Sequence, residues 1–191
     1  MSWDPYLDLD SGVLRNRLGI TDPAELAQAE AELTALRLAE LIGSPLPGRY
    51  DLTHLRAFHQ ALFGDLYSWA GELRTVSLGR AGHLFPFPED VARVATALFG
   101  VLAARDHLHG LPREDFLDGL TGLLADLNAL HPFREGNGRT QRAFVAQLAR
   151  DAGHTLRWAG LTRAENTAAS RAAFEGDLKP LHTLLDRLLV R

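Results

Sequence analysis

A short segment, His131 to Thr140 (HPFREGNGRT), gathers side chains that can do chemistry. It contains an imidazole, a carboxylate, guanidiniums and an amide, with glycines at Gly136 and Gly138. Glycines let a ligand approach main-chain N–H groups closely. A helix is predicted to begin at this turn, with its unpaired N–H donors and its partial positive charge directed at whatever occupies it. The segment therefore predicts an anion site.

Two arginines add positive charge beside this turn. Arg139 and Arg142 are three residues apart, so both guanidiniums project from one side of the first helical turns. Two forked cations together with helix donors fit a polyphosphate better than a single carboxylate. Glu135 can hold the Mg2+ of a nucleoside triphosphate, since that ion takes one or two protein carboxylates and keeps several waters. An imidazole has an ordinary pKa near ~6.5, so His131 can accept a proton from an incoming hydroxyl.

Each of these residues also has a simpler interpretation. Pro132 disfavours helix at the residue before it, so His131 and Pro132 could merely end a helix. Glu135 and Arg139 could form an ordinary i,i+4 pair on a solvated face, and the glycines could be plain turn residues. The combination favours the functional interpretation, because independent explanations would have to hold at seven positions at once.

The elements that must position this segment are predicted to be helices. Asp22-Pro23-Ala24-Glu25 is typical of a helix start, and Asp51 begins a second helix that ends at Gly64. Apolar residues from Phe116 to Leu130 recur at helical spacing, which predicts a central buried helix that leads straight into the segment. The expected helices span about 22–41, 51–63, 89–105, 113–130 and 138–152, followed by one from 162 and one capped by Asp177. The fold class is all-α, a bundle of about seven to eight helices.

Residues 74–87 differ from the rest of the chain. RTVSL alternates and is β-branched, an Ala-Gly pair interrupts, and HLFPF follows. This pattern predicts a short hairpin or irregular flap, the only β signal in the chain. Pro86 and Pro88 exclude a central strand.

Length and composition further limit the number of domains and the class of protein. With 191 residues, 46 % of them hydrophobic, the chain is expected to form one domain over 1–191. It has no cysteine, which excludes disulfides and thiolate metal sites. There is no basic start followed by an apolar core, and no apolar run reaches the ~18 to 20 residues of a membrane span, so we expect a soluble cytoplasmic protein. The net charge of −4 argues against a nucleic-acid binder, including a helix-turn-helix regulator built on 138–175.

Residues 131–142, HPFREGNGRTQR, resemble the signature of the Fic family (Fic/Doc superfamily), H-x-F-x-(D/E)-G-N-G-R-x-x-R, at every fixed position. The resemblance covers roughly residues 5–190 and implies the Fic fold, with GELRTVSL…LFPF as the β-hairpin flap. It implies transfer of AMP from ATP, with Mg2+, to a Ser, Thr or Tyr hydroxyl of a target protein, releasing pyrophosphate. His131 would deprotonate that hydroxyl, Phe133 would anchor the loop in the core, and Glu135 would hold the metal.

The resemblance also implies how the nucleotide and the target are bound. The turn Gly136-Asn137-Gly138 would cradle the phosphates, with Asn137 at the α-phosphate, Arg139 at the β-phosphate and Arg142 at the γ-phosphate. The flap would hold the target chain by main-chain pairing, as in strand addition. The flap residues expected to contact the target are Arg74, Thr75, Val76, Ser77, Leu78, His83, Leu84 and Phe85.

Gly138 bears on which group is transferred. The related Doc toxins carry lysine at this position and resemble kinases, so glycine favours AMP transfer over phosphoryl transfer. The alternatives are a Doc-like protein kinase, another reaction on the same fold such as phosphocholine transfer or AMP removal, or a catalytically silent module that binds a nucleotide or a partner. The intact His131 and Glu135 argue against the silent module.

Many Fic proteins carry an inhibitory helix, (S/T)-x-x-x-E-(G/N), whose glutamate pairs with the second motif arginine. Thr21…Glu25 has the spacing but is followed by leucine, and Ser170…Glu175 is off by one residue. The chain therefore resembles a free-standing toxin of a Fic toxin–antitoxin pair (class I), inhibited in trans at Arg142 by a small antitoxin, with the helix over about 23–41 as a docking surface. Such toxins resemble enzymes that modify DNA gyrase and topoisomerase IV.

Overall fold

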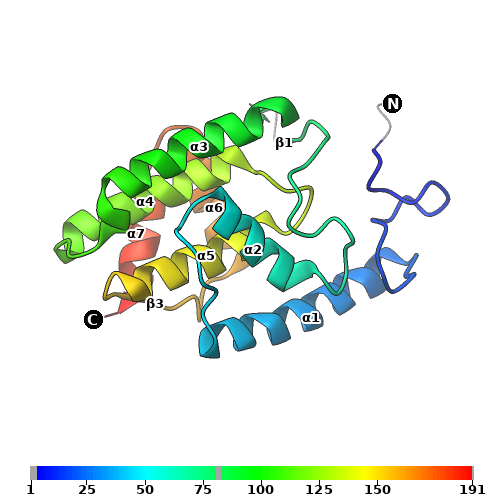
Figure 1. Ribbon diagram of the computed structural model, residues 1–191, viewed down its shortest axis with the longest axis horizontal. Helices are drawn as coiled ribbons and strands as arrows, with labels where there is room; N and C mark the ends of the chain where they lie inside the picture. Colours follow the sequence, from blue (N-terminus) through cyan, green and yellow to red (C-terminus); the bar gives the residue numbers. More distant parts are fainter. Residues whose placement is uncertain (1–3, 81–82, 191) are drawn as a thin grey trace.

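Seven α-helices make up most of the computed structural model, which describes residues 4–80 and 83–190 (Figure 1). This confirms the expected all-α bundle. The helices are α1 (Pro23–Gly43), α2 (Leu52–Phe63), α3 (Pro88–Ala104), α4 (Arg113–Leu130), α5 (Asn137–Asp151), α6 (Arg163–Phe174) and α7 (Lys179–Leu188), with a short 3-10 turn, η1 (Asp106–Leu108), before α4.

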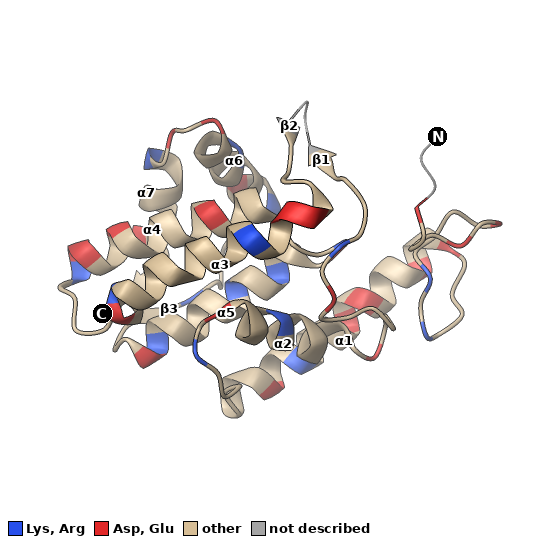
Figure 2. Cartoon of the chain, turned by 45° about the horizontal axis from the view of Figure 1, so that its top comes forward, with Lys and Arg blue, Asp and Glu red and all other residues tan. Residues whose placement is uncertain are grey.

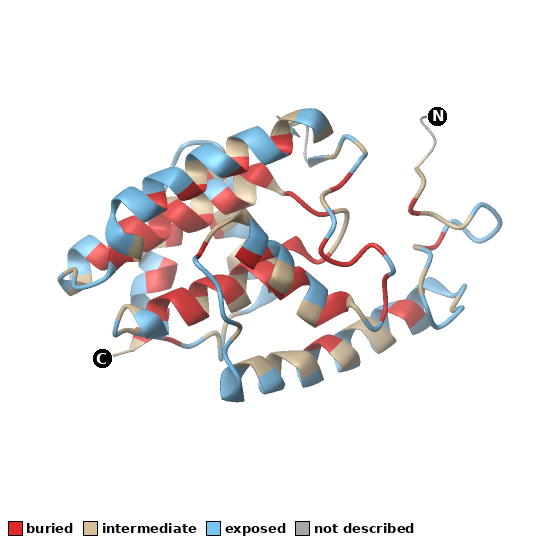
Figure 3. Cartoon of the chain, viewed as in Figure 1, coloured by how far each residue is buried: buried red, intermediate tan, exposed pale blue. Residues whose placement is uncertain are grey.

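The central helix is α4, which contacts α3, α5, α6 and α7. Its apolar residues at helical spacing, among them Phe116, Leu120 and Leu127, are fully buried. Figure 3 shows buried residues along the sides of the helices that face one another, and exposed residues on the outside. Because α4 is enclosed by its neighbours, its C-terminal end gives the segment that follows a fixed starting point.

The ends of the first two helices are set by aspartates. Asp22 accepts hydrogen bonds from the main-chain N–H groups of Ala24 and Glu25, both at 2.9 Å. Asp51 accepts one from the N–H of His54 at 2.8 Å. Such caps satisfy N–H donors that have no partner within the helix, so both predicted starts are confirmed.

The last two helices also begin near the predicted residues. Thr162 and Glu165 form a capping box, with each side chain bonded to the other's main chain, as expected. For α7 the N-cap is Leu178, one residue later than the sequence suggests. The carboxylate of Asp177 still accepts the N–H of Lys179 at 3.1 Å, so it contributes to the start of the helix.

The predicted hairpin is present, with β1 (Gly79–Arg80) antiparallel to β2 (His83–Leu84). The expectation that it would be the only β structure was wrong. A second antiparallel pair joins β3 (Thr155–Leu156) to β4 (Leu189–Val190). Strands of two residues have no alternating pattern to recognise, and this pairing connects segments far apart in sequence.

Two apolar clusters hold the bundle together. In the larger one, Phe144 on α5 lies edge-on to Phe58 of α2 and Phe99 of α3, with ring centroids 5.7 and 5.8 Å apart. The smaller one joins α1 and α2 to the segments before and after them, and includes Tyr6 and Trp69. It is this second cluster that fixes α1 along one side of the bundle (Figure 1).

The surface carries both signs of charge. Figure 2 shows acidic and basic residues interspersed over the helices. None of the described helices combines the length and the apolar character that crossing a bilayer requires.

Candidate active site

The signature segment is a tight loop between α4 and α5. His131 follows the last residue of α4 and adopts a left-handed conformation, with φ 43° and ψ 61°. Gly136, just before α5, is also left-handed, with φ 77°. Non-glycine residues seldom adopt this conformation, and it is held only where the surroundings enforce it. The loop therefore depends on its neighbours to keep His131 in place.

Phe133 and Asn137 hold the middle of the loop. The ring of Phe133 is buried, as the family resemblance implies. The Asn137 side chain accepts the main-chain N–H of Phe133 at 2.9 Å and donates to its carbonyl at 2.8 Å. Both functions of this amide are thus used within the loop. The amide nitrogen has a second N–H, so the expected contact of the Asn137 side chain with the α-phosphate stays a prediction, and the main-chain N–H groups that begin α5 are further donors for phosphate.

His59 of α2 supports the loop from the buried side, a role that was not among the expectations from the sequence. Its ring stacks on Phe133, with centroids 3.9 Å apart. Its Nδ1 accepts the N–H of Gly71 at 2.8 Å, and its Nε2–H donates to the carbonyl of Glu135 at 3.0 Å. Burial lowers the pKa of His59 to about 4, so the ring is neutral. The available signal was its place next to Phe58 and four residues before Phe63, on the apolar side of the helix.

Arg139 lies at the start of α5 with its guanidinium already engaged. It forms an ion pair with Glu30 of α1 and lies 3.4 Å from the hydroxyl of Thr34. Its guanidinium carbon is 4.9 Å from the centre of the Phe63 ring. One nitrogen lies 3.8 Å from a carboxylate oxygen of Glu135. The guanidinium is therefore held in one orientation beside the loop.

Arg142 presents a different situation. Its guanidinium lies alongside Gly138, where an added Cβ would be 3.2 Å from one nitrogen. Burial and the nearby charge of Arg139 lower its pKa. Among residues 4–80 and 83–190, no carboxylate lies within ion-pair distance of Arg142. A partly buried cation without an anion beside it is suited to receive one.

Glu135 lies at the edge of the same loop. Its side chain is 45 % exposed, and one oxygen accepts the N–H of Gly136 at 2.8 Å. Mg2+ prefers a small number of carboxylate oxygens and retains waters, so one accessible carboxylate beside a phosphate-binding turn fits that ion.

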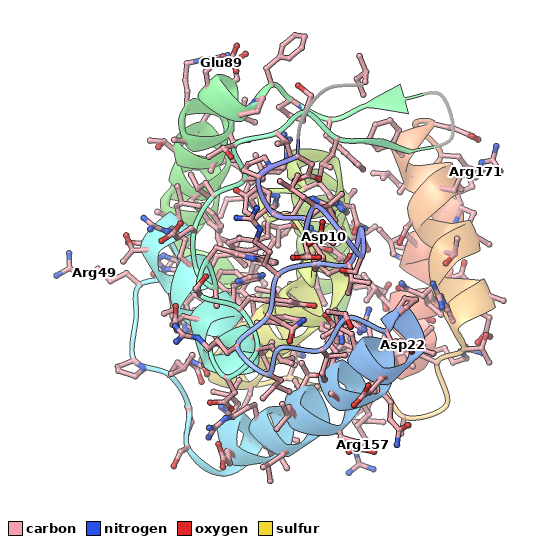
Figure 4. All side chains as sticks on the ribbon, turned by 90° about the vertical axis from the view of Figure 1, so that its right-hand side faces the viewer. Asp10, Asp22, Arg49, Glu89, Arg157 and Arg171 are labelled. Atoms are coloured by element: carbon pink, nitrogen blue, oxygen red, sulfur yellow. The ribbon has the colours of Figure 1, made fainter. Side chains whose placement is uncertain are left out.

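A cavity of about 210 Å³ opens beside His131. Phe85, from the flap, stacks flat on the His131 ring, with centroids 4.1 Å apart and planes inclined by 7°. Phe174 of α6 meets Phe85 edge-on at 5.8 Å. The lining also includes polar side chains of α4, α5 and α6, which are Asn128, Gln141, Asn166, Thr167, Ser170 and Arg171. Figure 4 shows the hairpin lying over the end of α6 that carries Arg171. The α6 residues have no sequence pattern that points to a site.

The flap residues differ in their exposure to solvent. Thr75, Ser77 and Leu84 are exposed, Val76, Leu78 and Phe85 are half-buried, and the side chain of His83 lies outside the described part of the structure. Arg74 is only 2 % exposed, so its expected contact with the target is wrong. Its guanidinium is bonded to main-chain carbonyls inside the protein, which leaves nothing to present to a partner.

Residues 49–149 match the model of the Fic/DOC family. This range runs from just before α2 to the last turns of α5 and contains the entire loop with both arginines. The chain belongs to the Fic/DOC family. The match confirms the expected family, and the flap, the loop and most of α5 lie within the matched residues.

Relatives within the Fic/DOC family cover nearly the whole chain. It is 39 % identical over 97 % of its length to the protein adenylyltransferase VbhT of Bartonella schoenbuchensis, and spans 39 % of that longer protein. It is 36 % identical over 97 % of its length to a protein of Escherichia coli named "Probable protein adenylyltransferase Fic", of which it covers 92 %. The BepC protein of Bartonella tribocorum, solved with AMPPNP, superposes with a TM-score of 0.89 at 25 % identity, covering 97 % of this chain and 96 % of BepC.

Proposed function

We propose that this chain transfers AMP from ATP to a Ser, Thr or Tyr hydroxyl of a protein target and releases pyrophosphate. The chain is a protein adenylyltransferase of the Fic/DOC family. The observation that carries the residue assignments is that His131 lines the same cavity as Gly138 in the first turn of α5, the helix that carries Arg139 and Arg142.

The proposed reaction needs a base, groups that bind the phosphates and a ligand for the metal ion. His131 accepts the proton of the attacking hydroxyl as its oxygen bonds to the α-phosphorus. The bond from that phosphorus to the oxygen shared with the β-phosphate breaks, and pyrophosphate leaves. Arg139, Arg142 and the N–H groups at the start of α5 bind the phosphates and stabilise the charge that develops on the leaving group. Glu135 holds Mg2+, which when bound supplies further positive charge to the phosphates.

The cavity beside His131 is the proposed binding site of the nucleoside. Phe85 and Phe174 meet at a right angle, which gives a flat base one ring to stack on and one edge to contact. Asn166 and Thr167 offer polar groups on the same wall. A nucleotide with its base here would place its phosphates toward His131 and Gly138, which also line the cavity.

The proposed regulation is inhibition in trans. Arg142 has no acidic partner among the described residues, which supports a partner that brings one. The proposal is therefore the toxin of a toxin–antitoxin pair, whose small antitoxin places a glutamate at Arg142 and docks on α1. If the isolated protein is inert with ATP and Mg2+ and Glu25→Gly activates it, the inhibitor is internal instead.

The proposed target class is type II topoisomerases, DNA gyrase and topoisomerase IV, modified in the cytoplasm. Main-chain pairing with the flap is the proposed means of holding the target. Among the described flap side chains, those of Thr75, Ser77 and Leu84 are exposed and available for that contact.

The test uses purified protein with Mg2+ and ATP labelled at either the α- or the γ-phosphate. We expect purified gyrase or topoisomerase IV subunits, or proteins in a lysate, to be labelled from α-labelled ATP only. His131→Ala should abolish labelling, while His182→Ala, on α7, should not, because His182 is not among the residues that line the cavity. Label from the γ-phosphate would make the protein a kinase, and label from neither would contradict AMP transfer.

A further inference from the structure

Arg74 is the largest fully buried side chain of the described residues. Burying a guanidinium is costly unless its donors are bonded. No carboxylate of residues 4–80 or 83–190 pairs with it; burial lowers its pKa, and its polar contacts are to main-chain carbonyls. Since this buried arginine pairs with no acid, we look for its role in the segments that its hydrogen bonds connect.

Those donors join three segments of the chain. Nε donates to the carbonyl of His131 at 2.8 Å, and one terminal nitrogen donates to the carbonyl of Val76 at 2.9 Å. The other terminal nitrogen donates to the carbonyl of Pro86 at 2.6 Å. Val76 and Pro86 lie on the two legs of the flap, before β1 and after β2. A single guanidinium therefore fastens both legs to the residue that begins the active-site loop.

The main chain of Arg74 reinforces this connection. Its N–H donates to the carbonyl of Pro132 at 2.9 Å, so Arg74 contacts two successive residues of the loop. These two residues are His131, which is left-handed, and Pro132, which directly follows it. Residues with a Cβ seldom adopt that conformation, so it persists only while such contacts hold it.

The flap also contacts the imidazole itself. Phe85, which stacks on the His131 ring, immediately precedes Pro86, whose carbonyl Arg74 holds. Arg74 thus acts on the main chain of His131 directly and on its ring through Phe85.

We propose that Arg74 is a positioning residue for the general base, and that the flap has a second role, which is to fix the orientation of His131. This inference rests on the proposed role of His131. Only arginine fits, because a planar fork can serve three carbonyls at fixed angles, whereas the ammonium of lysine is a compact group on a flexible stem.

The experiment compares Arg74→Lys with the wild type in α-labelled AMP transfer, and measures the Kd for a non-hydrolysable ATP analogue. We expect kcat to fall about 10- to 100-fold, as a base displaced by a fraction of an ångström would cause. The analogue should bind within about threefold of the wild-type Kd, since the proposed phosphate contacts lie elsewhere. Arg56→Lys is the matched control, because Arg56 donates to a single carbonyl, that of Gly71, and should leave kcat unchanged.

A second variant separates positioning from folding. In Arg74→Ala, millimolar guanidinium chloride should restore part of kcat with saturable dependence, whereas a merely unfolded variant would only lose activity. An unchanged kcat in Arg74→Lys, a parallel loss of kcat and analogue affinity, or no response to guanidinium would each overturn the inference. If the wild type transfers no α-label, the proposed function has failed. If the wild type transfers it and His131→Ala does not, the Arg74 variants test the positioning role alone.

Discussion

Glu30, on α1, forms an ion pair with Arg139, on α5, across a sequence separation of 109 residues. The same glutamate accepts a hydrogen bond from the hydroxyl of Tyr67, and burial together with Glu30 raises the pKa of that phenol. The two charged side chains are only 13 % and 24 % exposed. A motif arginine proposed to bind phosphate is therefore also the partner of a carboxylate within the protein.

Glu30→Gln tests which effect of this pair is larger. Glu30 orients Arg139, and fixing such a side chain is worth roughly 0.5–1.5 kcal/mol. Its negative charge also opposes an incoming polyphosphate, and Coulomb energies between partly buried charges a few ångströms apart reach about 4 kcal/mol. The charge effect is the larger, so we expect the KM for ATP to fall about three- to tenfold with little change in kcat.

Glu40→Gln is the control for that measurement. Glu40 lies on the same helix but pairs with Arg37 at the surface, where ion pairs contribute little. It should leave the KM for ATP unchanged. A rise in KM on Glu30→Gln would show instead that orientation of Arg139 dominates.

Gly136→Ala should destabilise the loop by two separate effects. An added Cβ would lie 2.4 Å from the Phe63 ring, and the residue would be held at φ 77°. Together the strain and the overpacking should cost roughly 2–5 kcal/mol. Gly153→Ala shares the left-handed conformation, with φ 88°, but has open space around the new atom. Urea denaturation measures the free energy of unfolding of both variants, and the difference between their losses is the effect of the clash. Equal losses of unfolding free energy would contradict the predicted contact with Phe63.

His59 should make the protein less stable in mild acid. Its folded pKa of about 4 lies below the ordinary value of 6.5, so the unfolded state binds the proton more tightly. Stability is then fully present above pH 6.5 and declines as the pH falls toward 4, by roughly 3 kcal/mol in total. Burial lowers the pKa of His54 as well, which adds a loss in the same direction.

His59→Gln should remove most of that pH dependence, even if it lowers stability at neutral pH. Denaturant titrations of both proteins at several values between pH 4 and 7 measure it. The same slope in the variant as in the wild type would show that another group is responsible.

Phe85→Leu should reduce AMP transfer by removing the flat contact with His131 and the edge contact with Phe174. We expect kcat to fall about tenfold, because a mobile imidazole spends less time in the orientation for proton transfer. Phe87→Leu, two residues on and 53 % exposed, is the matched control and should retain kcat. Equal activity of the two variants would contradict the role of the stack.

The helices and the core of the site were predictable because their signals are local. Asp22, Asp51 and the Thr162–Glu165 box each determine a helix start through contacts within three residues. The loop and the helix N-terminus after it form one contiguous segment, so their residue types alone indicated an anion site.

The parts that were not predictable depend on contacts between distant segments. Nothing in the sequence around Arg74 indicates that it is buried, because one of the carbonyls it bonds, that of His131, lies 57 residues further along the chain. Glu30 belongs to an amphipathic helix in which a glutamate is unremarkable until α5 is placed beside it. The α6 wall of the cavity and the β3–β4 pair arise in the same way.

The way the flap is fastened bears on how such an enzyme can evolve. Arg74 holds the two legs of the flap by main-chain carbonyls, which every residue type provides. Substitutions between Val76 and Phe85 therefore leave the fastening to His131 in place. A lineage can exchange residues there, and with them the proteins it modifies, while inheriting the chemistry unaltered.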